Sequence, residues 1–193
     1  VCPLDYSAEY IFTVGFPGLI LLQWRGMKLI GIAGTNGSGK DTVGHILAEK
    51  HGFLFVSVSD LLRDECRKRG LPIEREHLRE ISAEWRREGG LGVLIDRAVE
   101  EFERQHGRYA GLAVASVRNP GENDRVHGLG GTMVWVDANP RVRYDRIQAT
   151  SRGRGEEDAK TYEQFLVEQE AEMHTSGDAA TLNMSAVKDL CDI

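Results

Sequence analysis

The sequence has little cysteine, no membrane-length apolar run and no surplus of basic charge. Cys2, Cys66 and Cys191 fit neither a metal-ligand spacing nor a disulfide pattern, which favours a reducing, cytoplasmic location. The formal net charge of −6 argues against nucleic acid or a membrane surface as the main partner. Internal repeats and long low-complexity segments are also missing, so one domain with its own core is expected from 193 residues.

The first 26 residues differ in pattern from the rest of the chain. Residues 14–24 are apolar but too few to span a membrane. Asp5 and Glu9 precede this run, where a signal peptide would carry basic residues, so neither targeting interpretation is favoured. Because Met27 stands directly before the first strand pattern, we expect residues 1–26 to lie upstream of the natural start and 27–193 to form the domain. A segment that packs on the domain is the alternative.

Residues 28–42, KLIGIAGTNGSGKDT, join an apolar strand pattern to a glycine-rich loop and the start of a helix. Gly34, Gly39 and Lys40 have the spacing of a Walker A loop, in which backbone N–H groups surround phosphate oxygens and the lysine reaches the outer phosphates. A glycine-rich surface turn is the alternative, but it needs neither the strand nor the helix. The hydroxyl expected directly after the lysine comes one place later. The predicted ATP-binding residues are Gly34, Asn36, Gly37, Ser38, Gly39, Lys40, Asp41 and Thr42.

From Met27 onward, strand and helix patterns alternate, which predicts an α/β fold with a parallel sheet and helices on its faces. Strands are expected at residues 28–33, 53–58, 109–117 and 132–136. Helices are expected at residues 42–51, 60–68, 78–85, 91–102, 120–127, 140–147 and 162–173. The residues expected to cap helix starts are Ser59, Asn119, Asn139 and Thr161, the last in a capping box with Gln164.

Two segments, GTNGSGKDT and VSVSDLLRDE, resemble the adenylate kinase type of nucleoside monophosphate kinase. The second family motif, Ser-Thr-Gly-Asp-Leu-Leu-Arg, is matched at Ser57, Asp60, Leu61, Leu62 and Arg63. Val58 and Ser59 depart from it. SVRNPGE, VWVDANPRVRYDRIQATSRGR and TYEQFLVEQEAEM are similar to dephospho-CoA-kinase-like and nucleotide-kinase-like P-loop proteins. The resemblance covers Met27 to the end and implies a three-layer P-loop kinase fold with a short lid.

The resemblance also implies site residues for phosphoryl transfer from ATP with Mg²⁺. Catalytic roles fall to Lys40, Arg118, Arg152 and Arg154, acceptor binding to Asp60, Arg63 and Arg118, and metal binding to Thr42 and Asp60. A surface ion pair is the alternative for each arginine, and stabilisation of its own helix is the alternative for Asp60. Arg146 flanks the expected lid and could act in the site, or it could simply be one of the charged residues on a solvent-exposed helix face. Glu122 either orients Arg118 or favours the first turn of its own helix. The aspartate that many related kinases carry near the end of the third strand is replaced by Ala115, Ser116 and Val117.

The expected function is therefore ATP-dependent phosphoryl transfer to a small acceptor, a nucleoside or deoxynucleoside monophosphate. Dephospho-CoA is the alternative acceptor, and a nucleotide-binding regulator that signals to a partner is the alternative of a different class. Nucleic-acid and membrane partners are not expected. Related kinases continue with a further strand where this sequence ends at Ile193, so the final strand is expected to be missing or barely begun.

Overall fold

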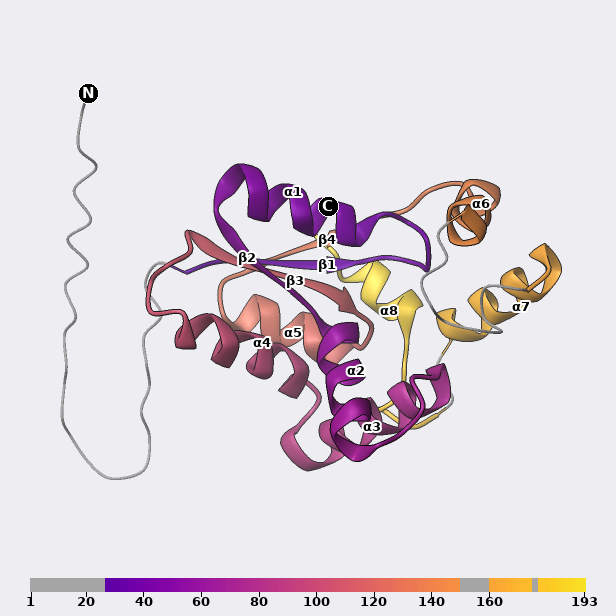
Figure 1. Cartoon of the computed structure of the whole chain (residues 1–193), viewed down its shortest axis with the longest axis horizontal. Coiled ribbons are helices and arrows are strands. Elements are labelled where there is room, and N and C mark those ends of the chain that lie inside the picture. Colours follow the sequence, from indigo (N-terminus) through magenta and orange to yellow (C-terminus); the bar gives the residue numbers. More distant parts are fainter. Residues whose placement is uncertain (1–26, 150–159, 175–176) are drawn as a thin grey trace.

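The computed structural model describes residues 27–149, 160–174 and 177–193, arranged as shown in Figure 1. Four parallel strands pair in the order β2-β3-β1-β4, so β1 and β3 lie in the middle of the sheet. The strands are β1 (Lys28–Ala33), β2 (Phe53–Ser57), β3 (Gly111–Val117) and β4 (Thr132–Trp135). The predicted parallel sheet is confirmed. Residues 1–26, together with Arg152 and Arg154 of the expected lid, lie outside the described residues.

Helices cover both faces of the sheet, as the alternating pattern predicts (Figure 1). One face carries α1, the other carries α2 to α5, and α6 and α7 lie beyond the end at which β1 leads into α1. The helices are α1 (Lys40–His51), α2 (Val58–Arg69), α3 (Arg75–Gly89), α4 (Val93–Arg104), α5 (Pro120–Gly128), α6 (Pro140–Ala149), α7 (Tyr162–Met173) and α8 (Met184–Asp189). This three-layer arrangement confirms the predicted fold class.

Successive side chains of the central strands point to opposite faces of the sheet and so belong to two separate hydrophobic clusters. On β3, Leu112 and Val114 join a large cluster with side chains of α2 to α5, whereas Ala113 and Ala115 belong to a smaller cluster with Val43 and other residues of α1. All of β3 is buried. Burying one Val or Leu side chain stabilises a fold by about 1.5–3 kcal/mol. The two cores therefore fix the sheet and the position of the loop that follows β1.

Three helices begin at the residues predicted from their caps. Asn119 accepts a hydrogen bond from the N–H of Gly121, and Glu122 completes the capping box. The side chain of Asn139 accepts from the backbone N–H at the start of α6. Thr161 forms the predicted capping box at the start of α7. These local hydrogen bonds satisfy N–H groups that have no partner within the helix, which is why the cap residues mark the boundaries.

The predicted start of α2 is wrong. The helix begins at Val58, and Ser57 is its N-cap residue without a side-chain cap hydrogen bond, so Ser59 lies inside the helix. Because Val58 is buried in the large core, β2 passes directly into α2 without a connecting loop. The predicted helix at residues 78–85 is too short, because α3 begins three residues earlier and ends four residues later. The remaining boundaries differ from the prediction by at most two residues. The short helix α8 was not predicted, because its six residues form too short a pattern to show a helical period.

The last residues of the chain lie along β4. The backbone N–H groups of Asp192 and Ile193 donate to the carbonyl of Met133, and the N–H of Trp135 donates to the carbonyl of Ile193 at 2.7 Å. This pairing occupies part of the edge of β4 that faces away from β1. Among the described residues, no helix is long and apolar enough to cross a membrane.

Candidate phosphate-transfer site

The loop after β1 is shaped for a phosphate. Gly34 has φ +144°, and a Cβ atom there would lie 2.1 Å from the carbonyl oxygen of Val136, so only glycine fits. Gly39 is the N-cap of α1 in a left-handed conformation and provides no side-chain cap. The first backbone N–H groups of α1 are therefore available to an anion, and the helix dipole adds partial positive charge at this end.

Polar side chains of the same loop fit a phosphate ligand. Lys40 is the first residue of α1, and although it is only 6% exposed it lines a cavity. Two further polar atoms, Ser38 Oγ and Asp41 Oδ1, are buried and make no hydrogen bond to any described residue. Buried polar atoms of this kind are rare without a bound partner. Thr42, by contrast, is exposed and does not belong to the described lining of the cavity.

A cavity of about 410 Å³ extends from the loop between α2, α3 and the carboxyl end of β3. Its volume is in the range of small-ligand sites. Cationic side chains outnumber carboxylates in its lining. The cations are Lys40, Arg63, Arg75, Arg79, Arg86 and Arg118, and the carboxylates are Asp41, Asp60 and Glu172. This excess of positive charge indicates that the cavity takes anionic ligands.

Asp60 and Arg63 of α2 both line the cavity, and they also form an ion pair with each other. Their side chains are 65% and 23% exposed, so the aspartate faces solvent more than the arginine does. The surface ion pair considered as an alternative is therefore present, but it lies in the wall of the cavity. No group of three or more acidic, histidine or cysteine side chains is placed to hold a metal ion in the described part of the chain.

Arg118, directly after β3, contacts a carboxylate that the sequence did not single out. Its Nη1 atom lies 3.1 Å from Oε2 of Glu172 on α7, and Arg75 and Arg79 of α3 contact Oε1 of the same carboxylate. Burial raises the pKa of Glu172, but the three arginines outweigh this effect and hold the pKa at about 2. Arg75 and Arg79 are four residues apart and so share one helix face, which is a signal that the sequence does contain.

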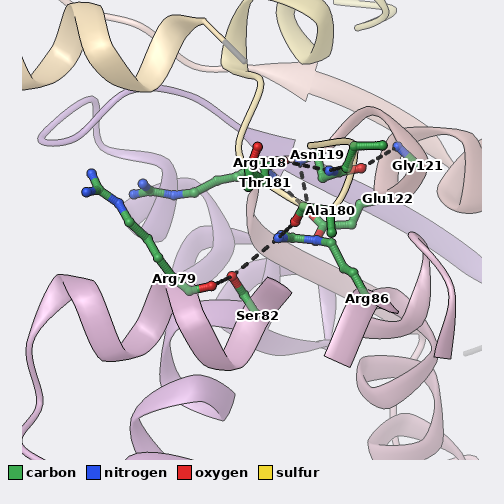
Figure 2. Close-up of polar contacts among 10 residues, drawn as sticks. Arg79, Ser82, Arg86, Arg118, Asn119, Gly121, Glu122, Ala180 and Thr181 are labelled. Carbon is green, nitrogen blue, oxygen red and sulfur yellow. Dashed lines mark hydrogen bonds and ion pairs between the residues drawn. The ribbon is translucent and has the colours of Figure 1, made fainter. Parts of the chain in front are cut away.

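Another arginine of α3, Arg86, pairs with Glu122, which Figure 2 shows near Arg118 and Asn119. Glu122 also accepts hydrogen bonds from the backbone N–H groups of Arg118 and Asn119. The role of Glu122 in the first turn of its own helix is observed, because it completes the capping box of α5. Through the same hydrogen bonds it also fixes the backbone of Arg118. It does not hold the Arg118 side chain, which pairs with Glu172.

Two arginines of α6 contact the phosphate loop from the other side. Arg146 donates to the backbone carbonyls of Gly37 and Ser38 at 3.4 and 3.3 Å. Arg143 is buried, donates to the carbonyl of Ala138 at 2.8 Å and reaches the carbonyl of Asn36 at 3.4 Å. Burial lowers the pKa of Arg143. The contact of Arg146 with the loop favours its functional interpretation over simple solvation of the helix.

Ser116 belongs to the segment 115–117 at the end of β3, in which the resemblance led us to expect an aspartate. It has φ +70° although it is not glycine, and the strand register shifts around it, from Ile32 opposite Ala115 to Ala33 opposite Val117. Ser116 is buried and lines the cavity. Strained non-glycine residues concentrate at functional sites. The sequence gives no signal for this conformation.

The fold and the loop define a P-loop nucleotide-binding protein of the kinase-like type. The family model described as "AAA domain" matches residues 30–171, and the chain belongs to this family. A UPF0200 protein from Pyrococcus abyssi is 30% identical over 150 residues, which cover 76% of this chain and 78% of the relative. A UPF0200 protein from Thermococcus kodakarensis is 32% identical over 138 residues, covering 69% and 72%.

Comparison with solved structures supports the fold. Shikimate kinase from Bacteroides thetaiotaomicron superimposes with a TM-score of 0.52 over 86% of this chain and 97% of that protein, at 14% sequence identity. At this identity the similarity shows the fold alone. The kinase-like P-loop fold that the motifs implied is confirmed, because the family model and the structural comparison agree on it.

Proposed function

We propose that the protein transfers the terminal phosphoryl group of ATP to a small acceptor that itself carries a phosphate. A nucleoside or deoxynucleoside monophosphate is the acceptor we propose. The observation that carries this proposal is that Lys40 of the phosphate loop shares one cavity with Arg63 and Arg118. A protein that only binds a nucleotide has no need for a second group of arginines opposite the loop, whereas phosphoryl transfer needs positive charge on both reacting phosphates.

The proposed roles follow from position. Lys40 and the loop N–H groups bind the outer phosphates of the donor, and Arg118 neutralises charge on the moving group. Arg63 and Arg118 bind the acceptor phosphate, and Asp60 orients Arg63 through their ion pair. Arg152 and Arg154 lie outside the described residues, and we propose that at least one of them also contacts the moving group.

The residues present also fit Mg²⁺, which usually binds one or two carboxylates together with phosphate oxygens and water. Asp60 and Thr42 are the proposed protein ligands. Asp60 lines the cavity together with Asp41, a further oxygen donor in the loop, whereas Thr42 lies outside the described lining. When bound with ATP, Mg²⁺ supplies positive charge to the donor phosphates.

The acceptor is tested by measuring ADP release with a panel of ribonucleoside and deoxyribonucleoside monophosphates, dephospho-CoA and shikimate. ATP-dependent ADP release that requires a monophosphate is the expected result. Turnover with dephospho-CoA alone would replace the proposed acceptor, and turnover with shikimate alone would show that the acceptor carries no phosphate. ATP binding without acceptor-dependent ADP release for any compound would contradict the kinase proposal and favour a regulatory protein.

A further inference from the structure

Three arginines of the cavity converge on one carboxylate. Glu172 is 9% exposed, and its two oxygens form ion pairs with Arg75 at 3.3 Å, Arg79 at 3.2 Å and Arg118 at 3.1 Å. The arginines come from α3 and from the end of β3, whereas the glutamate comes from α7. Figure 2 shows Arg79 and Arg118 extending in the same direction. The four side chains belong to the lining of the cavity.

The neighbouring Arg86–Glu122 pair provides a contrast within the same cavity wall. Its closest nitrogen and oxygen atoms are 2.6 Å apart, both side chains are almost completely buried, and Arg86 also donates to Ser82 and to the carbonyl of Ala180. Charge-assisted hydrogen bonds in good geometry measure about 2.7–2.9 Å. The three contacts of Glu172 are all longer than this.

A tetrahedral phosphate suits this place better than a carboxylate. It offers three oxygens, one for each guanidinium group, and carries about −1.5 to −2 charges near pH 7. Glu168 is a second carboxylate at the cluster, and it pairs with Arg75 at 3.3 Å. It also pairs with Lys160 at 2.5 Å, so its negative charge is divided between two cations. Among the described residues, three arginines of the cluster therefore share one enclosed carboxylate, that of Glu172.

We propose that Glu172 is an internal stand-in for the phosphate of the acceptor, and that a phosphate monoester binds among Arg75, Arg79 and Arg118 by displacing this carboxylate. The inference rests on the proposed function in naming the acceptor, but it concerns a binding event that does not need turnover. The carboxylate keeps the arginines assembled before the acceptor arrives and excludes weaker anions. Since it must leave first, it also lowers the apparent affinity for phosphate.

The test is a calorimetric titration of inorganic phosphate into the full chain at constant ionic strength. Glu172→Gln keeps the side-chain shape but removes the competing charge, and we expect it to bind phosphate about tenfold more tightly than the wild type, the equivalent of one charge-assisted hydrogen bond. The matched control is Glu170→Gln on the same helix, where Glu170 is 71% exposed and pairs with His174 outside the cavity lining. It should match the wild type.

Two double variants locate the bound phosphate. Glu172→Gln with Arg79→Ala should lose the gain, and Glu172→Gln with Lys40→Ala should keep it, because Lys40 belongs to the phosphate loop. Equal or weaker phosphate binding by Glu172→Gln would overturn the proposal, as would a gain that depends on Lys40 and not on Arg79. The phosphate titration does not depend on turnover, so its result is valid even if no acceptor in the panel causes ADP release. Failure of the proposed function can therefore be distinguished from failure of this inference.

A measurement on the wild type covers the case in which Glu172→Gln does not fold. Hydrogen exchange of the α7 amides should become faster when phosphate is added, since displacement of Glu172 removes the contacts of α7 with Arg79 and Arg118. Unchanged or slower exchange in α7 would contradict displacement.

Discussion

Arg86 and Glu122 form a buried ion pair that joins α3 to the start of α5, with Nη2 of the arginine 2.6 Å from Oε1 of the glutamate. Glu122 accepts the backbone N–H of Arg118 with its other oxygen, and Arg86 donates to the carbonyl of Ala180. Asn119 adds hydrogen bonds to the carbonyls of Ala179 and Thr181 (Figure 2). The pair therefore positions Arg118 and the segment before α8 on the same wall of the cavity.

Removing one partner of this pair should destabilise the fold strongly. Glu122→Ala leaves the Arg86 charge buried without its counter-ion, and breaking a buried pair in this way costs about 3–5 kcal/mol. Urea unfolding measures the loss. The control is Glu101→Ala, which breaks the exposed Arg104–Glu101 pair and should cost less than about 1 kcal/mol. Similar losses for both variants would show that the Arg86–Glu122 pair does not hold this wall together.

Arg63→Ala should weaken acceptor binding far more than ATP binding. We expect the KM for the acceptor to rise about tenfold or more, as for the loss of one charged hydrogen bond, with the KM for ATP nearly unchanged. Arg67→Ala is a matched control, because Arg67 pairs with Asp64 in the same i, i+3 arrangement and lies outside the described cavity lining. Steady-state kinetics with each substrate varied in turn gives both constants. Equal effects on the two KM values would remove Arg63 from the acceptor site.

The ion pairs of Glu172 predict how stability depends on pH. Its pKa is about 2 in the folded protein against an ordinary value of 4.5, so the carboxylate stabilises the fold above about pH 4.5 and this contribution is lost as pH falls toward 2. The free energy of unfolding of the wild type should exceed that of Glu172→Gln by a constant amount above pH 5, on the order of 3 kcal/mol. The difference should shrink below pH 4.5. A difference that stays constant down to pH 2 would contradict the depressed pKa.

Ser116→Gly should stabilise the protein. A non-glycine residue at positive φ stores strain of order 1–3 kcal/mol, which glycine relieves, while the greater chain entropy of glycine offsets about 0.5–1 kcal/mol. We expect a net gain of about 1 kcal/mol in urea unfolding. Ser116→Ala removes the hydroxyl but keeps Cβ and therefore the strain, so it should show no gain. An equal gain for both variants would attribute the effect to the hydroxyl and not to the backbone.

Local chemistry made much of the fold predictable from the sequence. The first strand and the phosphate loop form a continuous pattern in which Gly34 and Lys40 occupy fixed places, and the capping boxes at Asn119 and Thr161 involve residues only three positions apart. Ser59 was the wrong cap because the burial of Val58 decides where α2 begins. The start of a helix thus follows the local cap only where packing does not override it.

The candidate site was predictable only in part. Lys40, Arg63 and Arg118 follow motifs, and the structure brings all three to one cavity. Glu172 lies 97 positions from Arg75 in the sequence, and that contact exists only because the folded chain brings side chains of α7 within reach of α3. The left-handed conformation of Ser116 likewise depends on the register shift between β1 and β3, which no local pattern encodes.

The most direct test of the account is the rate of phosphoryl transfer from ATP to a nucleoside monophosphate by Lys40→Ala, with folding checked by circular dichroism. Lys50→Ala is the matched control, because it removes the same charge from the exposed last turn of α1. The account predicts that Lys40→Ala folds normally and loses at least about 100-fold in kcat, as expected for removing one charge aimed at the reacting phosphates, while Lys50→Ala keeps its activity. Unchanged turnover by Lys40→Ala would contradict the central claim.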